Sequence, residues 1–228
     1  MTKILALDTS TDACSVALYL DGEVQQDFRV IPRQHTQQLL PMVQAMLAEA
    51  ELSVQQLDAI AFGRGPGSFA GIRIATGVTQ GLAFAADLPV LPVSTLASLA
   101  LSAAHEEGAT EVVAALDARM DEIYAAAYQI IQGLPVERLP EQVCSPSSLV
   151  LPEMSAPLAV GSGWRYLDSM SSEVQQQVSV SSGTYYPNAA VMLLLALADW
   201  EQGKAVSAEQ ALPVYLRDEV AWKKMDQQ

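Results

Sequence analysis

Residues 4–10 read Ile-Leu-Ala-Leu-Asp-Thr-Ser, and this stretch decides the fold because the pattern it begins is repeated later in the chain. An apolar strand over residues 3–7 runs directly into Asp8. A β-rich segment follows over residues 14–30, and the dipeptide Asp21-Gly22 at its middle is a strong hairpin-turn signal. The first part of the chain therefore predicts a strand that ends in an aspartate, a polar turn and a two-stranded hairpin.

The same order of elements returns in the second half of the chain. An apolar strand over residues 111–116 ends at Asp117, and a second predicted hairpin covers residues 122–144. Asp8 and Asp117 are 109 residues apart, and the hairpin glycines Gly22 and Gly133 are 111 residues apart. Two unrelated α/β pieces would also give this pattern, since hairpins are common. The sharper interpretation is a pair of duplicated lobes that face each other across a cleft.

Composition limits what the chain can do. Its 228 residues include 12 Lys and Arg against 26 Asp and Glu, a net charge of −14. Because nucleic-acid affinity comes mainly from basic residues that displace counterions, we expect no binding to nucleic acid by this chain alone. Charged residues make up 17% of the chain and hydrophobic residues 50%, whereas charged residues are about 25% of an average domain. This apolar excess indicates a face buried against another chain.

No segment is long and apolar enough to cross a membrane. The longest apolar run, residues 189–198, is half of the roughly 20 residues that a bilayer requires. Asp8 interrupts the N-terminal apolar stretch before a signal peptide could form. Cys14 and Cys144 are too few for a disulfide framework or a cysteine zinc site. We therefore expect a cytoplasmic protein.

Two loops have the residue types of anion-binding sites. The turn Asp8-Thr9-Ser10 offers amides and hydroxyls for phosphate and a carboxylate for hydrated Mg²⁺, but such residues are also ordinary after a strand. Residues 63–69, Gly-Arg-Gly-Pro-Gly-Ser-Phe, lie between a predicted strand and a predicted helix, as in loops that present a helix N-terminus to an anion. The sequence is not a Walker A loop, and it leaves ligand binding and helix packing equally open.

Two helices have unusual surfaces. In the predicted helix over residues 71–86, Gly77, Gly81 and Ala85 recur every four residues, and each internal glycine costs about 1 kcal/mol relative to alanine. Close approach of another helix would compensate this cost. The predicted helix over residues 37–50 has apolar residues around much of its circumference. Packing of the two helices within the chain is one explanation, and a helix bundle formed with another chain is the favoured one.

The sequence contains no His-x-x-x-His metal motif and no Gly-x-Ser-x-Gly nucleophile motif. The two histidines, His35 and His105, are 70 residues apart, and no His-x-x-x-His pair occurs. Ser68 does not stand in a Gly-x-Ser-x-Gly elbow. Asp117 and Arg119 are explained equally well by an internal ion pair and by a ligand clamp. We predict no catalytic residue and no metal site.

Taken together, these motifs resemble a known family. The duplicated lobes are similar to the actin, sugar-kinase and Hsp70 ATPase (ASKHA) superfamily, and residues 4–10, 33–41, 63–73 and 117–119 resemble the TsaB (YeaZ) family in particular. The similarity continues into residues 213–217. Members of this family are subunits of the bacterial machinery that makes threonylcarbamoyladenosine (t6A) at position 37 of tRNAs reading ANN codons. Ala70 departs from the threonine expected after Phe69.

The resemblance implies a scaffold or activator and not an enzyme. In TsaD, the catalytic relative that transfers the threonylcarbamoyl group, a His-x-x-x-His metal pair occurs where this sequence has Thr95 and Leu99. A small-molecule kinase of the same superfamily and a glycoprotease-like metallopeptidase are the alternatives. The implied partners are TsaD in a heterodimer, TsaE, and a second copy in isolation, with tRNA bound only through the complex. No catalytic cofactor is implied; partner subunits use ATP, and a nucleotide at the complex interface stays open.

The resemblance also assigns lobes and sites. The N-terminal lobe is expected over residues 1–103 and the C-terminal lobe over 104–228, with the tail from about residue 212 packed back on the N-terminal lobe. The expected fold is α/β, with each lobe a mixed sheet flanked by helices. The expected partner-binding residues are Leu39, Leu40, Val43, Met46, Leu47, Ile74, Gly77, Val78, Gly81 and Ala85. The expected remnant of a nucleotide cleft comprises Asp8, Thr9, Ser10, Gly65, Gly67, Ser68, Asp117 and Arg119.

Overall fold

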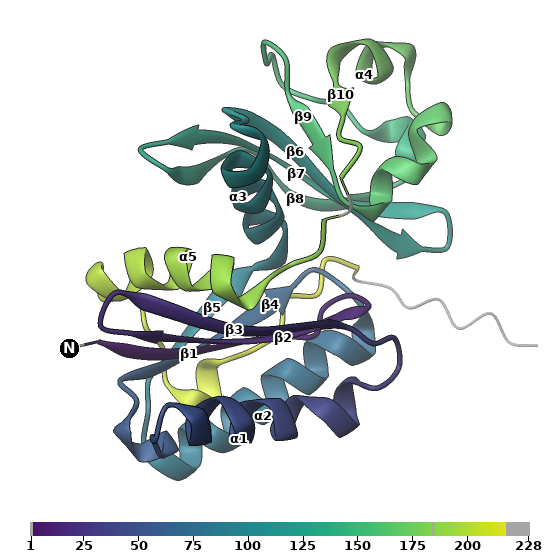
Figure 1. Ribbon diagram of the computed structural model, residues 1–228. Helices are drawn as coiled ribbons and strands as arrows, with labels where there is room; N and C mark the ends of the chain where they lie inside the picture. The colour runs from purple at the N-terminus through teal and green to yellow at the C-terminus, as the bar shows by residue number, and fades with distance from the viewer. Residues whose placement is uncertain (1, 184, 218–228) are drawn as a thin grey trace, which may run out of the picture.

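The structure, a computed structural model, describes residues 2–183 and 185–217, and these form two lobes stacked one above the other (Figure 1). Each lobe is built on one five-stranded mixed sheet, in the orders β3-β2-β1-β4-β5 and β10-β9-β6-β7-β8. Read from the hairpin edge, both sheets have the order third, second, first, fourth, fifth strand of their lobe. The predicted α/β fold of two duplicated lobes is therefore confirmed.

The first sheet consists of β1 (Lys3–Asp8), β2 (Ala13–Leu20), β3 (Glu23–Val30), β4 (Ala59–Gly65) and β5 (Val90–Ser94). The central strand β1 runs antiparallel to β2 and parallel to β4. From Ile4 onward its residues are buried, because helices cover both faces of the sheet. A strand covered on both faces reads as a continuous apolar run, and this explains why residues 4–7 carry no alternation.

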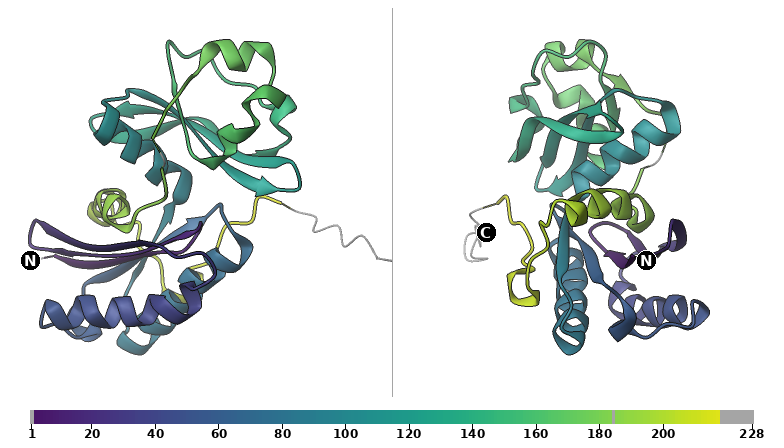
Figure 2. Two further views of the ribbon diagram at one scale, coloured as in Figure 1. Left: turned by 45° about the vertical axis from the view of Figure 1, so that its right-hand side comes forward. Right: turned by 90° about the vertical axis from the view of Figure 1, so that its left-hand side faces the viewer.

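Helices cover the two faces of this sheet from different parts of the chain. On one face lie α1 (His35–Glu49) and α2 (Phe69–Ala86), with η1 (Val54–Gln56) between them in sequence. On the other face lies α5 (Ala189–Glu201), whose Met192 and Leu193 pack against Ile4 and Leu91. Figures 1 and 2 show α5 between the first sheet and the second lobe, while α1 and α2 lie on the far side.

The second sheet consists of β6 (Glu111–Arg119), β7 (Glu122–Ile131), β8 (Leu134–Cys144), β9 (Leu158–Val160) and β10 (Ser179–Val180). Helix α3 (Thr95–Glu107) covers one face through a cluster that includes Leu96 and Leu99. The short helices η2 (Pro146–Ser148), η3 (Ser162–Ser169) and α4 (Ser172–Gln177) belong to the other side, where Trp164 joins the core. This lobe therefore repeats the layered plan of the first with shorter helices.

The lobes do not divide the chain at residues 103 and 104 as the sequence suggested. Helix α3 lies within the expected N-terminal lobe but packs on the second sheet, whereas α5 lies within the expected C-terminal lobe but packs on the first sheet. After α5, η4 (Ala208–Gln210) also joins the core under α1 and α2. The chain thus crosses between the lobes at the start of α3 and again before α5, because both sheets need helices on two faces.

The expected return of the tail to the N-terminal lobe is seen as far as the described chain extends. The Val214 amide donates to the Arg64 carbonyl over 2.8 Å, and Tyr215 contacts α2. Residues 218–228, which contain Lys223 and Lys224, lie outside the described residues. Among the helices of the described chain, none has the length and apolar character required to span a bilayer.

Candidate partner interface and remnant nucleotide cleft

The turn after β1 uses its polar groups within the protein. Asp8, Thr9 and Ser10 are buried. The Ser10 amide and hydroxyl donate to Asp8 Oδ1 over 3.0 and 2.9 Å, and the Thr9 hydroxyl donates to the Gly71 carbonyl over 2.7 Å. These groups form an internal network at the position where the sequence suggested phosphate or magnesium contacts.

The glycine-rich loop lies directly on this turn. The Ser68 amide donates to the Ser10 carbonyl over 2.7 Å. A Cβ atom at Gly67 would lie 2.5 Å from the Ser10 carbonyl oxygen, and one at Gly71 would lie 1.9 Å from that of Thr9. Both glycines are therefore required by backbone packing. The Ser68 hydroxyl accepts from the Gly71 amide and caps α2, so the loop's residues serve the packing alternative.

The second oxygen of Asp8 is an exception within this network. Oδ2 is buried and has no hydrogen-bond partner among the described residues. It lies against the backbone of Gly63, where a Cβ atom would come within 1.9 Å of it. Burial raises the pKa of Asp8 to about 7, although the two Ser10 hydrogen bonds lower it. A carboxyl group that points into the core in this way does not fit a magnesium ligand.

The residues expected across the cleft belong to a separate network in the second lobe. Asp117 Oδ1 accepts from the Arg119 amide over 2.8 Å, and Asp117 Oδ2 lies 3.5 and 3.7 Å from the guanidinium groups of Arg119 and Arg165. The Tyr166 hydroxyl also donates to Asp117. The structure therefore brings Asp8, Thr9, Ser10, Gly67 and Ser68 together, while the contacts of Asp117 lie in its own lobe.

The two positions that replace the metal pair of TsaD have structural roles. The Thr95 hydroxyl donates to the Pro66 carbonyl, and Leu99 is buried in the core of the second lobe. Within residues 2–183 and 185–217, no three His, Cys, Asp or Glu side chains cluster as metal ligands would. The donor set at this place does not suit a transition metal.

Two ion pairs join the lobes, and the sequence did not indicate either. Glu141 on β8 accepts from Arg64 of β4 over 3.0 Å and also from the Ser94 hydroxyl. Arg217 in the tail pairs with Glu122 at the start of β7 and donates to the Ala118 carbonyl. Because these partners are 77 and 95 residues apart in sequence, only the folded chain brings them together.

The outer face of α2 is open. A Cβ atom added at Gly77 or at Gly81 would meet no atom within 4 Å. The glycines therefore do not serve packing within the chain. Phe69 at the start of the helix is 55% exposed and Phe84 near its end is 73% exposed. Ala85 is exposed on the same side, whereas Ile74 and Val78 are partly buried against the core. Phe69 and Phe84 are surface residues that the sequence analysis did not select.

Most of the residues expected on α1 are not at the surface. Leu39, Val43, Met46 and Leu47 are buried in the core beneath the first sheet. They lie at the helical spacing of a single stripe, and that stripe faces the sheet. Only Leu40 of the α1 set is exposed, at 43%. These four side chains pack inside the chain, and their contact with a partner stays a prediction.

The two helices together are nearly free of charge. Apart from the buried His35, the only ionisable side chains in α1 and α2 are Glu49 and Arg73. Surface helices ordinarily carry charged and polar residues on the side away from the core. A face with open glycines, exposed phenylalanines and so few charges has the composition of a surface that another protein covers.

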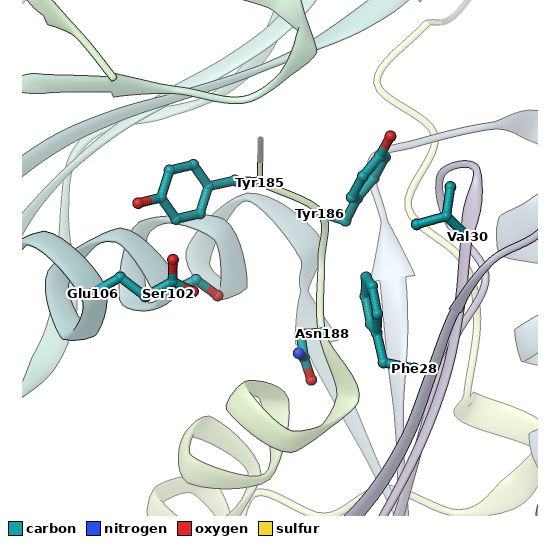
Figure 3. Close-up of a pocket in the computed structure, with 7 residues that line it drawn as sticks. All are labelled: Phe28, Val30, Ser102, Glu106, Tyr185, Tyr186 and Asn188. Carbon is teal, nitrogen blue, oxygen red and sulfur yellow. The ribbon is translucent and has the colours of Figure 1, made fainter. Parts of the chain in front are cut away.

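A pocket of about 280 Å³ lies where the chain crosses back toward the first lobe (Figure 3). Phe28 and Val30 of β3 form one wall, and the Phe28 ring lies 6.4 Å from that of Tyr186. Ser102 and Glu106 of α3 form the opposite wall, with Tyr185 and Asn188 from the crossing segment. The sequence analysis selected none of the residues that line this pocket.

Two lobes, each built on a mixed sheet with the same strand order, define the class of protein as a duplicated two-lobed α/β fold. A family model described as "TsaD: tRNA N6-adenosine threonylcarbamoyltransferase" matches residues 29–224. The TsaB protein of Escherichia coli is 44% identical over 98% of both chains, and that of Haemophilus influenzae is 43% identical over 97% of this chain and 96% of its own.

The fold comparison agrees with these sequence matches. The structure titled "YeaZ from Pseudomonas aeruginosa" superposes with a TM-score of 0.90 and 49% identity, covering 95% of this chain and 100% of that one. The relatives from E. coli and H. influenzae are both named tRNA threonylcarbamoyladenosine biosynthesis protein. The chain belongs to the TsaB family.

Proposed function

We propose that this chain is a non-catalytic subunit in the formation of t6A at position 37 of tRNAs reading ANN codons, and that it binds and activates TsaD. The printed names of its relatives support the role in t6A formation. The observation that carries the binding role is the outer face of α1 and α2, defined here as the partner face and comprising Leu40, Phe69, Arg73, Gly77, Gly81, Phe84 and Ala85. Its open glycines allow the close approach of a helix from another chain.

The non-catalytic assignment is supported by the hydrogen bonds and ion pairs that the residues of the expected nucleotide cleft form within the protein. The loop over residues 65–71 packs on the turn after β1, and the hydroxyls of Thr9 and Ser10 are bonded within the protein. Asp117 is engaged by the arginines beside it. We therefore assign no catalytic cofactor to this chain. Partner subunits, TsaE among them, use ATP. Any nucleotide of the complex binds at the interface between subunits. The complex acts in the cytoplasm.

The variant Gly81→Leu tests the partner face. The added side chain enters space that is empty in the monomer but filled by a helix in the complex, and overpacking costs about 1–3 kcal/mol. We expect the affinity for TsaD to fall at least about tenfold, and t6A formation in a reconstituted system to be lost. The isolated variant should stay folded, because leucine is favoured over glycine in a helix by about 1 kcal/mol.

The matched control is Gln176→Leu, which adds a leucine at an exposed position of α4 in the second lobe. This variant should bind TsaD as the natural chain does. Titration calorimetry gives the affinities, and thermal melting followed by circular dichroism gives the stability of each variant. Unchanged binding of TsaD by Gly81→Leu would place the interface elsewhere.

A further inference from the structure

The pocket between β3 and α3 has aromatic walls. Phe28 and Tyr186 contribute rings whose centres lie 6.4 Å apart at an angle of 48°, and Tyr185 contributes a third ring. Figure 3 shows the Phe28 ring nearly edge-on, with one face turned across the pocket toward α3. Phe28 is 37% exposed on the outermost strand of the first sheet. Because the face of an aromatic ring is electronegative, such a wall attracts cations as well as apolar groups.

The opposite wall of the pocket carries negative charge. Glu106 lies on α3 one turn after Ser102, and Figure 3 shows its side chain extending toward Ser102. The neighbouring Glu107 accepts hydrogen bonds from the Ser181 and Tyr185 hydroxyls, and these hold the pKa of Glu107 below its ordinary value. Within the part of the chain that the structure describes, neither glutamate forms an ion pair.

The basic residue next to this wall in sequence is turned away from the pocket. Arg29 follows Phe28 in β3, and successive side chains of a strand point to opposite faces of the sheet. The Arg29 guanidinium donates to Asp27 over 2.9 and 2.6 Å and to Gln38 of α1, which covers the other face. Among the described residues that line the pocket, none is Lys, Arg or His. The negative charge of α3 is therefore left for a cation from outside the chain.

The size and chemistry of the pocket select an alkylated ammonium ion. Its volume of about 280 Å³ lies just below the range of about 300–1,000 Å³ typical of pockets for drug-sized ligands, so the ligand is small. A divalent metal ion requires several oxygen ligands, and no three metal-ligating side chains cluster in residues 2–183 and 185–217. A trimethylammonium group has no N–H donor to satisfy, and aromatic rings attract it through their faces.

We propose that this pocket binds a small organic cation with a trimethylammonium group, held between the Phe28 and Tyr186 rings and the Glu106 carboxylate. Asn188 is fixed beside them, because its side-chain oxygen caps α5 by accepting from the Ala190 amide over 2.8 Å. Since β3 belongs to the first sheet and α3 packs on the second, the bound cation joins the two lobes. The inference does not depend on the proposed function, because the pocket shares no lining residue with the partner face.

Titration calorimetry of the full chain with choline tests the site. The neutral comparison is dimethylbutanol, in which a tert-butyl group replaces the trimethylammonium group. We expect choline to bind one site per chain with a dissociation constant below about 5 mM. The neutral alcohol should bind at least about tenfold more weakly, because the rings and the carboxylate then lose the positive charge that they attract. All titrations are made at equal ionic strength, since salt screens the charges.

Two substitutions locate the bound cation. Phe28→Leu keeps an apolar side chain but removes the ring, and Glu106→Gln keeps the shape of the side chain but removes its charge. Each should weaken the binding of choline at least about fivefold. The matched controls are Phe84→Leu on α2 and Glu173→Gln on α4, which change exposed side chains outside the pocket. Both controls should bind choline as the natural chain does.

Circular dichroism melting shows that each variant is folded, and choline should raise the melting temperature of the natural chain more than that of Phe28→Leu. A dissociation constant for choline above about 5 mM, or equal binding of choline and dimethylbutanol, would overturn the inference. Choline binding that Phe28→Leu and Glu106→Gln leave unchanged would also overturn it, because the cation would then bind outside this pocket. The proposed function is measured separately, by the affinity of Gly81→Leu for TsaD.

Discussion

Asp8 has one carboxylate oxygen bound by Ser10 and another that faces Gly63 without a partner. The residue types of this turn suggested a phosphate or magnesium site, but the Asp8 side chain is buried against the backbone of Gly63. The ionised form of Asp8 destabilises the folded protein, because burial removes the water around the carboxylate and no cation takes its place among the described residues. The same residue that suggested a phosphate site in the sequence is therefore a source of pH-dependent instability.

Replacing Asp8 with asparagine should remove this pH dependence. Because burial raises the pKa of Asp8 to about 7 from 3.8, the folded protein holds a proton that the unfolded chain releases as the pH rises between these values. The contribution of this group to the free energy of unfolding is thus present at low pH and lost by pH 7. At about 1.4 kcal/mol per pKa unit the loss amounts to a few kcal/mol.

Urea unfolding of the natural chain and of Asp8→Asn at several pH values between about 4 and 8 measures this effect. Asp8 changes its protonation over this range of pH. Asp8→Asn should be more stable than the natural chain near pH 8, and the difference should shrink or reverse near pH 4. A difference in unfolding free energy that is constant with pH would show that Asp8 is ionised in the folded protein throughout.

At the scale of elements, local signals predicted the first strand of each lobe, the two hairpins and the helices over residues 37–50 and 71–86, because each has a short-range cause. The turn residues Asp21 and Gly22 adopt left-handed backbone angles, as the hairpin requires. Helix α1 was placed correctly but its faces were not, since apolar residues at many positions do not reveal which side the sheet covers. The return of α5 to the first sheet depends on long-range packing that no local pattern encodes. Likewise, the glycines of α2 predicted close approach without saying whether the neighbour is internal.

Two adjacent residues of α1 differ in burial and allow the core side of the helix to be tested separately from its surface side. Leu39 is buried in the core, and Leu40 is 43% exposed on the partner face. Leu39→Ala should lower the free energy of unfolding by about 2–5 kcal/mol, the usual cost of removing a buried leucine side chain. Leu40→Ala should change stability by less than about 0.5 kcal/mol and weaken TsaD binding. Chemical denaturation and calorimetric titration of the pair distinguish these effects. Equal loss of stability in both would mean that α1 has no free face.

At the scale of the whole molecule, two ion pairs join the lobes. The Arg64–Glu141 pair joins β4 to β8, and the tail carries Arg217 to Glu122 after being held to β4 at Val214. These two connections between the lobes are made by the protein's own side chains.

The isolated chain should therefore have no catalytic turnover. We expect ATP hydrolysis, sugar or acid phosphorylation and peptide cleavage at buffer background, because the Ser10–Asp8 pair is buried and the described part of the chain has no cluster of metal ligands. Metal analysis of the same preparation accompanies these assays. Turnover that follows the protein through purification would favour the kinase alternative, and a stoichiometric transition metal with peptide cleavage would favour the metallopeptidase.

The distribution of charge leads to the last prediction, which concerns tRNA. In the part of the chain that the structure describes, six basic residues already form ion pairs with the chain's own carboxylates: Arg29, Arg64, Arg119, Arg165, Lys204 and Arg217. A cation in such a pair must leave its carboxylate before it can displace counterions from a phosphate backbone, and the net charge of −14 repels that backbone at longer range. We expect no binding of tRNA by the isolated chain at concentrations up to about 10⁻⁵ M and physiological salt.

Fluorescence anisotropy with labelled tRNA measures this, with TsaD alone and the TsaD complex as comparisons. The complex should bind with an affinity and salt dependence close to those of TsaD, since the phosphate contacts then come from the partner. Micromolar, salt-sensitive binding by the isolated chain would instead assign the tRNA contact to this subunit.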